Sequence, residues 1–112
     1  MLKVGFQHRF RPAHQWLHAE IRDGRLGRVC LLRIHRFWPF PYFPEMSPDP
    51  HATWRGSTLG GWALTDIGTH SIDLALWLLA EPAQIAYARA DNFKFADVAG
   101  EDTAIVLLET PS

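Results

Sequence analysis

Residues 60–79 read GGWALTDIGTHSIDLALWLL, and apolar residues recur at helical spacing through most of this stretch. They fall on almost every side of the helix that they would form, which predicts a largely buried helix over residues 64–80. Three titratable residues, Asp66, His70 and Asp73, interrupt the apolar pattern. Because they are spaced four and three residues apart, we expect their side chains to share one side of the helix.

A buried helix that carries three titratable side chains must provide a partner for each of them. One explanation is catalytic: His70 titrates near neutrality and can carry a proton, while a neighbouring carboxylate orients it or binds a substrate hydroxyl. Another is structural, with Asp66 capping the helix and His70 paired with Asp73. A third is a metal site, in which Asp66 and His70 need a further ligand such as Glu45 or His51. The spacing alone leaves these alternatives open.

The sequence on either side predicts the remaining elements. Apolar residues on one helical face predict a helix over residues 12–23, which Gly24 ends in a left-handed conformation. Residues 28–38, 83–95 and 103–110 are rich in β-branched and aromatic residues, as strands are. We therefore expect an α+β fold, with a mainly antiparallel open sheet and helices packed on one face.

Composition narrows the class of protein. The 112 residues are 47% hydrophobic and 21% charged, as is typical of one soluble domain. A net charge of −1 provides no field to attract nucleic acid, and no apolar run approaches the ~20 residues of a membrane-spanning helix. With Cys30 as its one cysteine and no signal-peptide pattern, the chain is expected to be cytoplasmic. We expect Cys30 itself to be buried in the predicted strand.

Residues 39–50 contain five prolines, each of which lacks an amide donor and disfavours helix in the residue before it. This stretch is therefore predicted to be a long loop. Several aromatic residues lie in it or next to it. We expect the loop to form a wall or lid beside a site.

Several separated motifs resemble one family. GGWALTDIGTHSID at 60–73 resembles the signature G-G-G-x-x-x-D-x-G-x-H-x-x-D of the glucose-fructose oxidoreductase, inositol dehydrogenase and rhizopine-catabolism (Gfo/Idh/MocA) family. VGFQHRFRP at 4–12 is similar to its V-G-F-x-x-R-F-x-P passage, and DGRLGRV at 23–29 to its G-x-[LI]-G-x-[VI] motif. Trp54 and Arg55 stand where the family often has W-R. The resemblance extends over nearly the whole chain.

The resemblance implies roles for particular residues. His70 would be the catalytic acid/base, and Asp66 would orient it or bind the substrate hydroxyl. Further substrate-binding residues are expected from several segments: Arg9, Trp54, Arg55 and Asp73. For Arg9 and Arg55 the guanidinium fork suits an anionic or hydroxylated substrate, and a structural role is the competing explanation.

The other histidines, His8, His14, His18 and His35, have no carboxylate at a useful spacing. We therefore expect them at the surface or at an interface.

The resemblance also implies an NAD- or NADP-dependent oxidoreductase that acts on a hydroxyl carbon of a sugar or polyol, and a homo-oligomer. The chain contains neither a G-x-G-x-x-G turn nor the family's E-K-P motif. We therefore expect these 112 residues to hold no cofactor and no metal, and to be inactive alone. They resemble the start of a C-terminal substrate-binding and oligomerisation domain, and residues 1–11 resemble the end of a missing Rossmann domain. The alternative is a non-catalytic dimerisation or interaction module.

Overall fold

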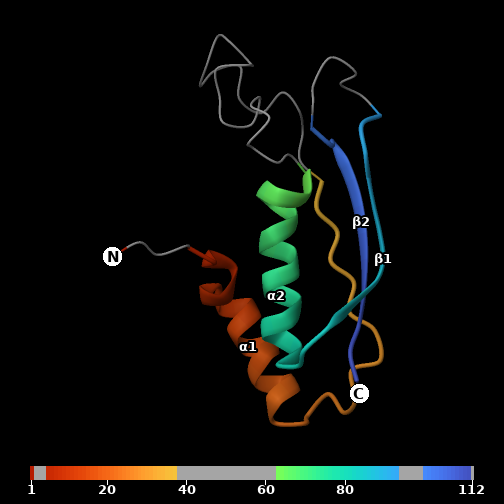
Figure 1. Ribbon diagram of the computed structural model, residues 1–112. Coiled ribbons are helices and arrows are strands. Elements are labelled where there is room, and N and C mark those ends of the chain that lie inside the picture. Colours follow the sequence, from red (N-terminus) through yellow and green to blue (C-terminus); the bar gives the residue numbers. More distant parts are fainter. Residues whose placement is uncertain (2–4, 38–62, 94–99, 112) are drawn as a thin grey trace.

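The computed structural model describes residues 1, 5–37, 63–93 and 100–111 (Figure 1). Two helices lie on one side of a two-stranded antiparallel sheet, which is the predicted α+β arrangement. In chain order the elements are the 3-10 helix η1 (Gln7–Phe10), α1 (Pro12–Arg22), the π-helix η2 (Ala63–Gly68), α2 (Thr69–Leu79), β1 (Gln84–Asp91) and β2 (Thr103–Glu109).

Helix α1 has nearly the predicted bounds. It ends as expected, because Gly24 adopts φ +70°, a left-handed conformation that a side chain would disfavour. Trp16 is one of the apolar residues that form the predicted packing face of α1, and it is 62% exposed. His18 instead stacks on Trp77 of α2, with ring centroids 4.1 Å apart and planes at 19°. His18 therefore lies on the side of α1 that faces α2. The exposed Trp16 lies outside this contact, because α2 covers only one side of α1.

The predicted long helix is formed by η2 and α2 together. In η2 the backbone at Gly68 packs closely against the side chain of the preceding turn. A Cβ on Gly68 would lie 3.0 Å from Cδ1 of Leu64, so a glycine suits this position. The hydroxyl of Thr69 donates to the carbonyl oxygen of Asp66 over 2.9 Å, where the helix changes pitch. Asp66 thus belongs to the π-helical part and His70 to the α-helical part.

Helix α2 provides the buried centre of the molecule. Leu74 and Leu78 are 4% and 3% exposed, and Asp73 is buried beside them. Leu76, on another side of the helix, reaches 36% exposure, so α2 is less completely buried than its sequence predicts. Among the described helices, none combines the length and the apolar character needed to cross a membrane.

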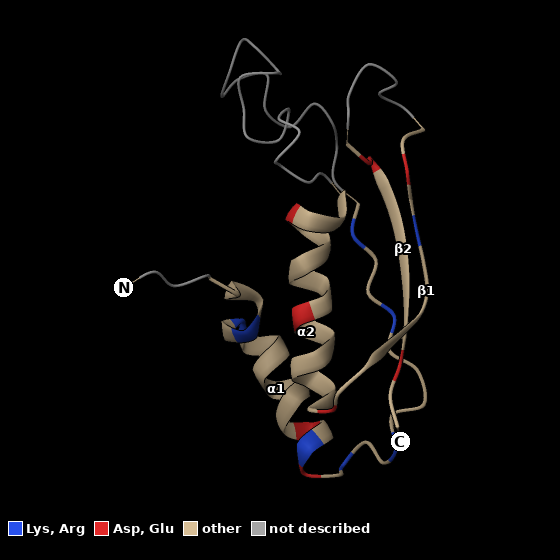
Figure 2. Ribbon diagram, viewed as in Figure 1, with Lys and Arg blue, Asp and Glu red and all other residues tan. Residues whose placement is uncertain are grey.

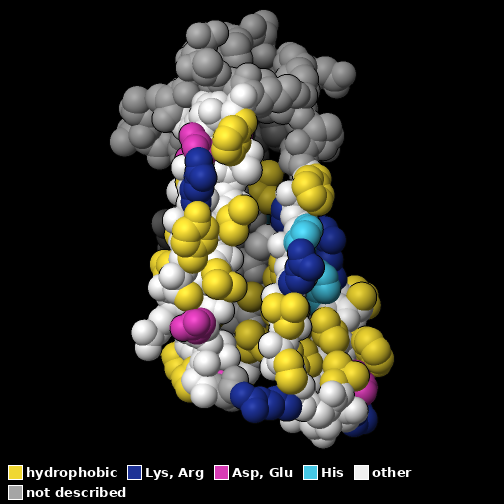
Figure 3. Space-filling model, turned by 90° about the vertical axis from the view of Figure 1, so that its right-hand side faces the viewer, with side chains coloured by type: hydrophobic (Ala, Val, Ile, Leu, Met, Phe, Trp, Pro, Cys, Tyr) yellow, Lys and Arg dark blue, Asp and Glu magenta, His cyan; other side chains and the backbone are white. Residues whose placement is uncertain are grey.

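The two strands fall inside their predicted ranges. They pair from Gln84 opposite Glu109 to Asp91 opposite Thr103, with an irregularity after Ile85. Many of their apolar side chains are uncovered, and Figure 3 shows hydrophobic groups spread over this side of the molecule. The exposed set includes Ile85, Tyr87, Ile105 and Leu107.

The third predicted strand, over residues 28–38, is wrong for residues 28–37, and residue 38 lies outside the described part. Exposure alternates along 31–37 as it would in a strand, and the segment lines the same cavity as α2 and β2. No backbone ladder joins it to the described strands, however, and a strand requires a partner for its amides and carbonyls. Cys30 is exposed for the same reason, contrary to the prediction.

Candidate functional site

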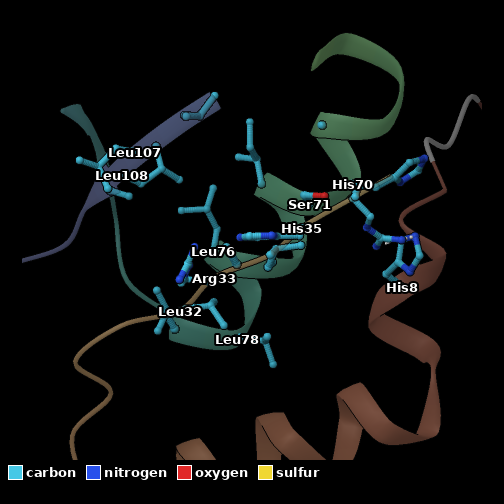
Figure 4. Close-up of a pocket in the computed structure, with 18 of the residues that line it drawn as sticks. His8, Leu32, Arg33, His35, His70, Ser71, Leu76, Leu78, Leu107 and Leu108 are labelled. Carbon is cyan, nitrogen blue, oxygen red and sulfur yellow. Dashed lines mark hydrogen bonds between the residues drawn. The ribbon is translucent and has the colours of Figure 1, made fainter. Parts of the chain in front are cut away.

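His70 lies in the first turn of α2, and its ring lines an open cavity (Figure 4). The Nδ1 atom of this ring is enclosed and has no hydrogen-bond partner among the described residues. Two rings from the N-terminal segment pack against His70 at steep angles. The ring centroid of Phe6 is 6.1 Å away with planes at 81°, and that of His8 is 5.5 Å away with planes at 71°. Ring packing therefore holds His70 in place.

The cavity has two different ends. It runs between α2, residues 27–37 and β2, and its volume of about 2310 Å³ exceeds the roughly 300–1,000 Å³ of most small-molecule pockets. In Figure 4 leucines such as Leu107 and Leu108 lie at one end, and His8 and His70 lie at the other. The candidate site is placed at the end with the histidines, where the described residues combine enclosed polar atoms with aromatic rings.

His8 is a buried member of this site, only 6% exposed, so of the two expected positions, surface or interface, the surface position is wrong. An Nη2–H of Arg36 donates to its Nε2 over 3.1 Å, and its carbonyl oxygen is 2.7 Å from Nδ1 of His14. Burial, with the positive charges of Arg36 and Arg11 nearby, lowers the pKa of His8 to about 4. His8 is therefore neutral at neutral pH.

Arg36 comes from the segment that did not form a strand. This segment carries three arginines, visible as blue bands along its trace in Figure 2: Arg28, Arg33 and Arg36. Exposure alternates here, so Arg36 is half-buried whereas Arg33 and His35 are exposed. The extended backbone thus directs one guanidinium to His8.

Asp73, predicted to bind substrate or to pair with His70, is bound by Arg9. Nε of Arg9 donates to Oδ2 of Asp73 over 2.8 Å, and Nη2 of Arg9 donates to Oδ1. The hydrogen bond to Asp73 raises the pKa of Arg9. This two-point contact favours the structural explanation for Arg9, and a substrate-binding role for either residue stays a prediction.

Asp66 lies one turn before His70, and both residues line the cavity. The two residues that the spacing singled out thus line one cavity. The carboxylate does not hydrogen-bond to Nδ1 of His70, because that atom has no hydrogen-bond partner within residues 1, 5–37, 63–93 and 100–111. The orienting role of Asp66 stays a prediction.

The remaining predicted positions lie outside the described residues. These are Trp54 and Arg55, the alternative metal ligands Glu45 and His51, and the proline-rich stretch 39–50. Within the described ranges, no three His, Cys, Asp or Glu side chains are close enough to hold a metal ion.

Three residues of the site were not singled out by their sequence pattern: His8, Arg36 and Ser71. Like Nδ1 of His70, the hydroxyl of Ser71 is enclosed and has no hydrogen-bond partner among the residues that the structure describes. For His8 the available signal was its place inside the family-like motif VGFQHRFRP. Local spacing to a carboxylate could not find it, because its partners come from distant segments.

Residues 14–112 match the family model described as the GFO/IDH/MocA C-terminal domain. Inositol 2-dehydrogenase 2 of Saccharopolyspora erythraea is 32% identical over 98% of this chain and 29% of its own length. Myo-inositol dehydrogenase Hyg17 of Streptomyces leeuwenhoekii is 33% identical over 96% of this chain and 31% of its own length. Levoglucosan dehydrogenase of Pseudarthrobacter phenanthrenivorans is 35% identical over 70% of this chain and 20% of its own length.

The chain thus spans about 30% of the length of the two inositol dehydrogenases. No solved structure was found to match it. The family model covers nearly all of the chain, and the relatives are similar over the same residues. The chain therefore belongs to the Gfo/Idh/MocA family, and residues 14–112 match the C-terminal domain of that family.

Proposed function

We propose that this chain supplies the acid/base histidine and part of the substrate site of an oxidoreductase that acts on a hydroxyl group of a sugar or polyol. The observation that carries the proposal is the Nδ1 of His70, which is enclosed at the polar end of the cavity and has no hydrogen-bond partner in the part of the chain that the structure describes. Family membership adds support, because similar proteins are named as dehydrogenases of inositol and levoglucosan.

His70 carries the proton in this proposal. When the substrate is oxidised, its O–H bond breaks and the proton moves to Nδ1 of His70, because an unprotonated imidazole nitrogen accepts a proton through its lone pair. Asp66, on the same wall one turn earlier, binds the reacting hydroxyl or a neighbouring one. Packing of Phe6 and His8 against His70 keeps the ring from turning away.

The described residues do not fit the phosphates of a dinucleotide. Such phosphates bind at a glycine turn that opens a helix, whereas Gly24 and Gly27, the described glycines with positive φ, lie in an exposed turn followed by extended chain. The resemblance implies NAD or NADP, which would accept the hydride. We place that cofactor on a separate domain, and we expect these 112 residues alone to be inactive.

The uncovered sheet favours a second role, self-association. Tyr87 and Leu107 are cross-strand partners, and both are more than half exposed. We propose that a second copy of the chain covers this face. An exposed, unpaired Cys30 suits a reducing compartment, which supports a cytoplasmic location.

The test of the catalytic proposal uses the complete oxidoreductase with its nucleotide-binding domain. We expect His70→Gln to lower kcat by about 10² to 10⁴, because a positioned acid/base is lost, while the thermal midpoint changes little. The control is His35→Gln, an exposed histidine that lines the same cavity away from the polar end. A His70→Gln protein that is folded and turns over at a near-normal rate would refute the assignment.

A further inference from the structure

We propose that His8 and His70 together bind one hydroxyl group of the substrate, with His8 donating a hydrogen bond to its oxygen and His70 accepting a hydrogen bond from its O–H. The identity of the ligand rests on the proposed function. The site itself rests on two enclosed nitrogen atoms, Nδ1 of His8 and Nδ1 of His70, neither of which has a hydrogen-bond partner among the described residues. Enclosed polar atoms without partners are rare in folded proteins, so two on adjacent rings indicate a shared ligand.

Arg36 determines which nitrogen of His8 carries the hydrogen. A guanidinium has only N–H groups and cannot accept, so the contact of 3.1 Å between Nη2 of Arg36 and Nε2 of His8 requires Nε2 to accept. A neutral imidazole with an accepting Nε2 carries its hydrogen on Nδ1. The enclosed Nδ1 of His8 is therefore a donor with a fixed direction.

The charges around His8 keep it in this neutral form. Arg36, Arg11, His14 and His70 all face it, and with burial they lower its pKa to about 4. His8 therefore does not compete for the proton that the substrate gives to His70.

The two rings are neighbours, and the proposal requires the Nδ1 atoms of both to face the same oxygen. The ring centroids of His8 and His70 are 5.5 Å apart. An oxygen at hydrogen-bond distance from two nitrogens can join nitrogens up to about 6 Å apart. The ion pair between Arg9 and Asp73 joins η1 to α2 and so holds the two rings at this separation.

A hydroxyl group is the chemistry that satisfies both atoms. It accepts through its lone pairs and donates through its O–H, whereas a carboxylate only accepts and an ammonium only donates. The oxygen therefore receives the Nδ1–H of His8 and gives its own hydrogen to Nδ1 of His70. Water and an alcohol share this chemistry, and the experiment must separate them.

Two variants of His8 separate its two nitrogens. In His8→Asn the side-chain amide can place an N–H where Nδ1 lies, which keeps the donor to the oxygen and loses the acceptor for Arg36. In His8→Gln the amide oxygen can reach the position of Nε2, which keeps the acceptor for Arg36 and loses the donor. We expect His8→Gln to lower kcat/KM of the complete oxidoreductase about tenfold or more below that of His8→Asn, because only His8→Asn keeps the donor. A structural role through Arg36 predicts the reverse order, and that result would overturn the inference.

NMR spectra of the ring nitrogens of the 112-residue chain give a readout independent of activity. The wild-type spectrum is expected to show hydrogen on Nδ1 of His8, and hydrogen on Nε2 instead would overturn the inference. Titration with myo-inositol is expected to shift the Nδ1 signals of both histidines and to remove any magnetisation transfer from water to the Nδ1–H of His8. Unchanged signals, with transfer from water persisting at saturation, would show that the pair holds water only.

The same data separate the two proposals. If His70→Gln leaves kcat unchanged while myo-inositol still shifts both histidine signals, the proposed catalytic role fails and the shared hydroxyl site stands. If His70→Gln lowers kcat as expected while His8→Gln and His8→Asn both behave as wild type, the proposed function stands and the shared site is refuted.

Discussion

Arg9 and Asp73 are 64 residues apart in sequence and form a two-point ion pair that joins η1 to α2. The carboxylate is nearly enclosed, with its side chain 9% exposed, whereas the arginine side chain is 39% exposed. His8 directly precedes Arg9, and His70 lies one turn before Asp73. The ion pair therefore fixes the two elements that carry the histidines relative to each other.

Removing the buried charge tests this role. We expect Asp73→Asn to lower the thermal midpoint of the 112-residue chain by roughly 5–10 °C, because a buried two-point contact is lost. Asp23→Asn is the matched control, since Asp23 pairs with Arg22 and Arg25 at the exposed end of α1. Exposed pairs contribute little, so this variant should melt like the wild type. Equal effects of the two substitutions would contradict the structural role of Asp73.

The low pKa of His8 predicts that the protein loses stability as the pH falls. In the unfolded chain residue 8 binds a proton below about pH 6.5, whereas in the folded chain it does so only below about pH 4. Between these values the unfolded state binds more protons, so acid favours unfolding. The free energy of unfolding should fall by about 3 kcal/mol across this window from His8 alone.

Urea denaturation at several pH values measures this loss, and His8→Gln is the reference because its side chain does not titrate. Subtracting the two proteins removes the contribution of the carboxylates that they share. The difference should be flat above pH 7 and should change steadily as the pH falls toward 4. Parallel stability curves for the two proteins would show that His8 titrates normally.

The end of α2 offers a substitution that should stabilise the protein. Ala80 adopts φ 53° and ψ 29° there, a left-handed conformation that costs free energy for a residue with a Cβ. Ala80→Gly should raise the free energy of unfolding by about 0.5–1 kcal/mol, as measured by urea denaturation. Gly24→Ala is the converse, since Gly24 has φ +70° with open space around it, and it should lower stability by about 1 kcal/mol. A loss of stability in Ala80→Gly would contradict the assigned backbone conformation.

The elements that the sequence predicted correctly are those specified by local signals. Helix α1 ends beside Gly24, as the glycine predicts. The apolar repeat that forms η2 and α2 is longer than a typical strand, and its length indicates a helix. Residues 28–37 show the limit of such signals: their composition and alternation suit a strand, but strand formation depends on a neighbouring edge that composition does not reveal.

In the candidate site, too, local spacing predicted some features and could not predict others. The helical repeat placed Asp66 and His70 on one wall, because positions four apart share a helix face. It could not reveal that Arg9 binds Asp73, or that His8 is buried against His70 and bound by Arg36. These contacts join η1, α2 and residues 28–37, so only the tertiary structure brings them together.

The proposed self-association makes a prediction about the outer face of the sheet. Arg89 pairs with Ile105 and Tyr87 pairs with Leu107, so these side chains share one face. Exposed apolar groups gathered on a face with unpaired strand edges favour association with another copy. Light scattering should therefore report a mass above the 12.8 kDa of one chain. The interface between the copies should bury more than the roughly 1,000 Å² that specific contacts need.

A matched pair of substitutions locates that interface. Leu107 on β2 and Leu26 in the turn after α1 are both 52% exposed, so a lysine at either position changes exposed apolar surface to a similar extent. Leu107→Lys should reduce the measured mass toward that of a monomer, because it buries a charge in the contact, whereas Leu26→Lys should leave the assembly intact. If the wild-type chain is already a monodisperse monomer at high micromolar concentration, the sheet is not covered by a second copy. If both variants dissociate alike, the contact is not centred on the outer face of β1 and β2.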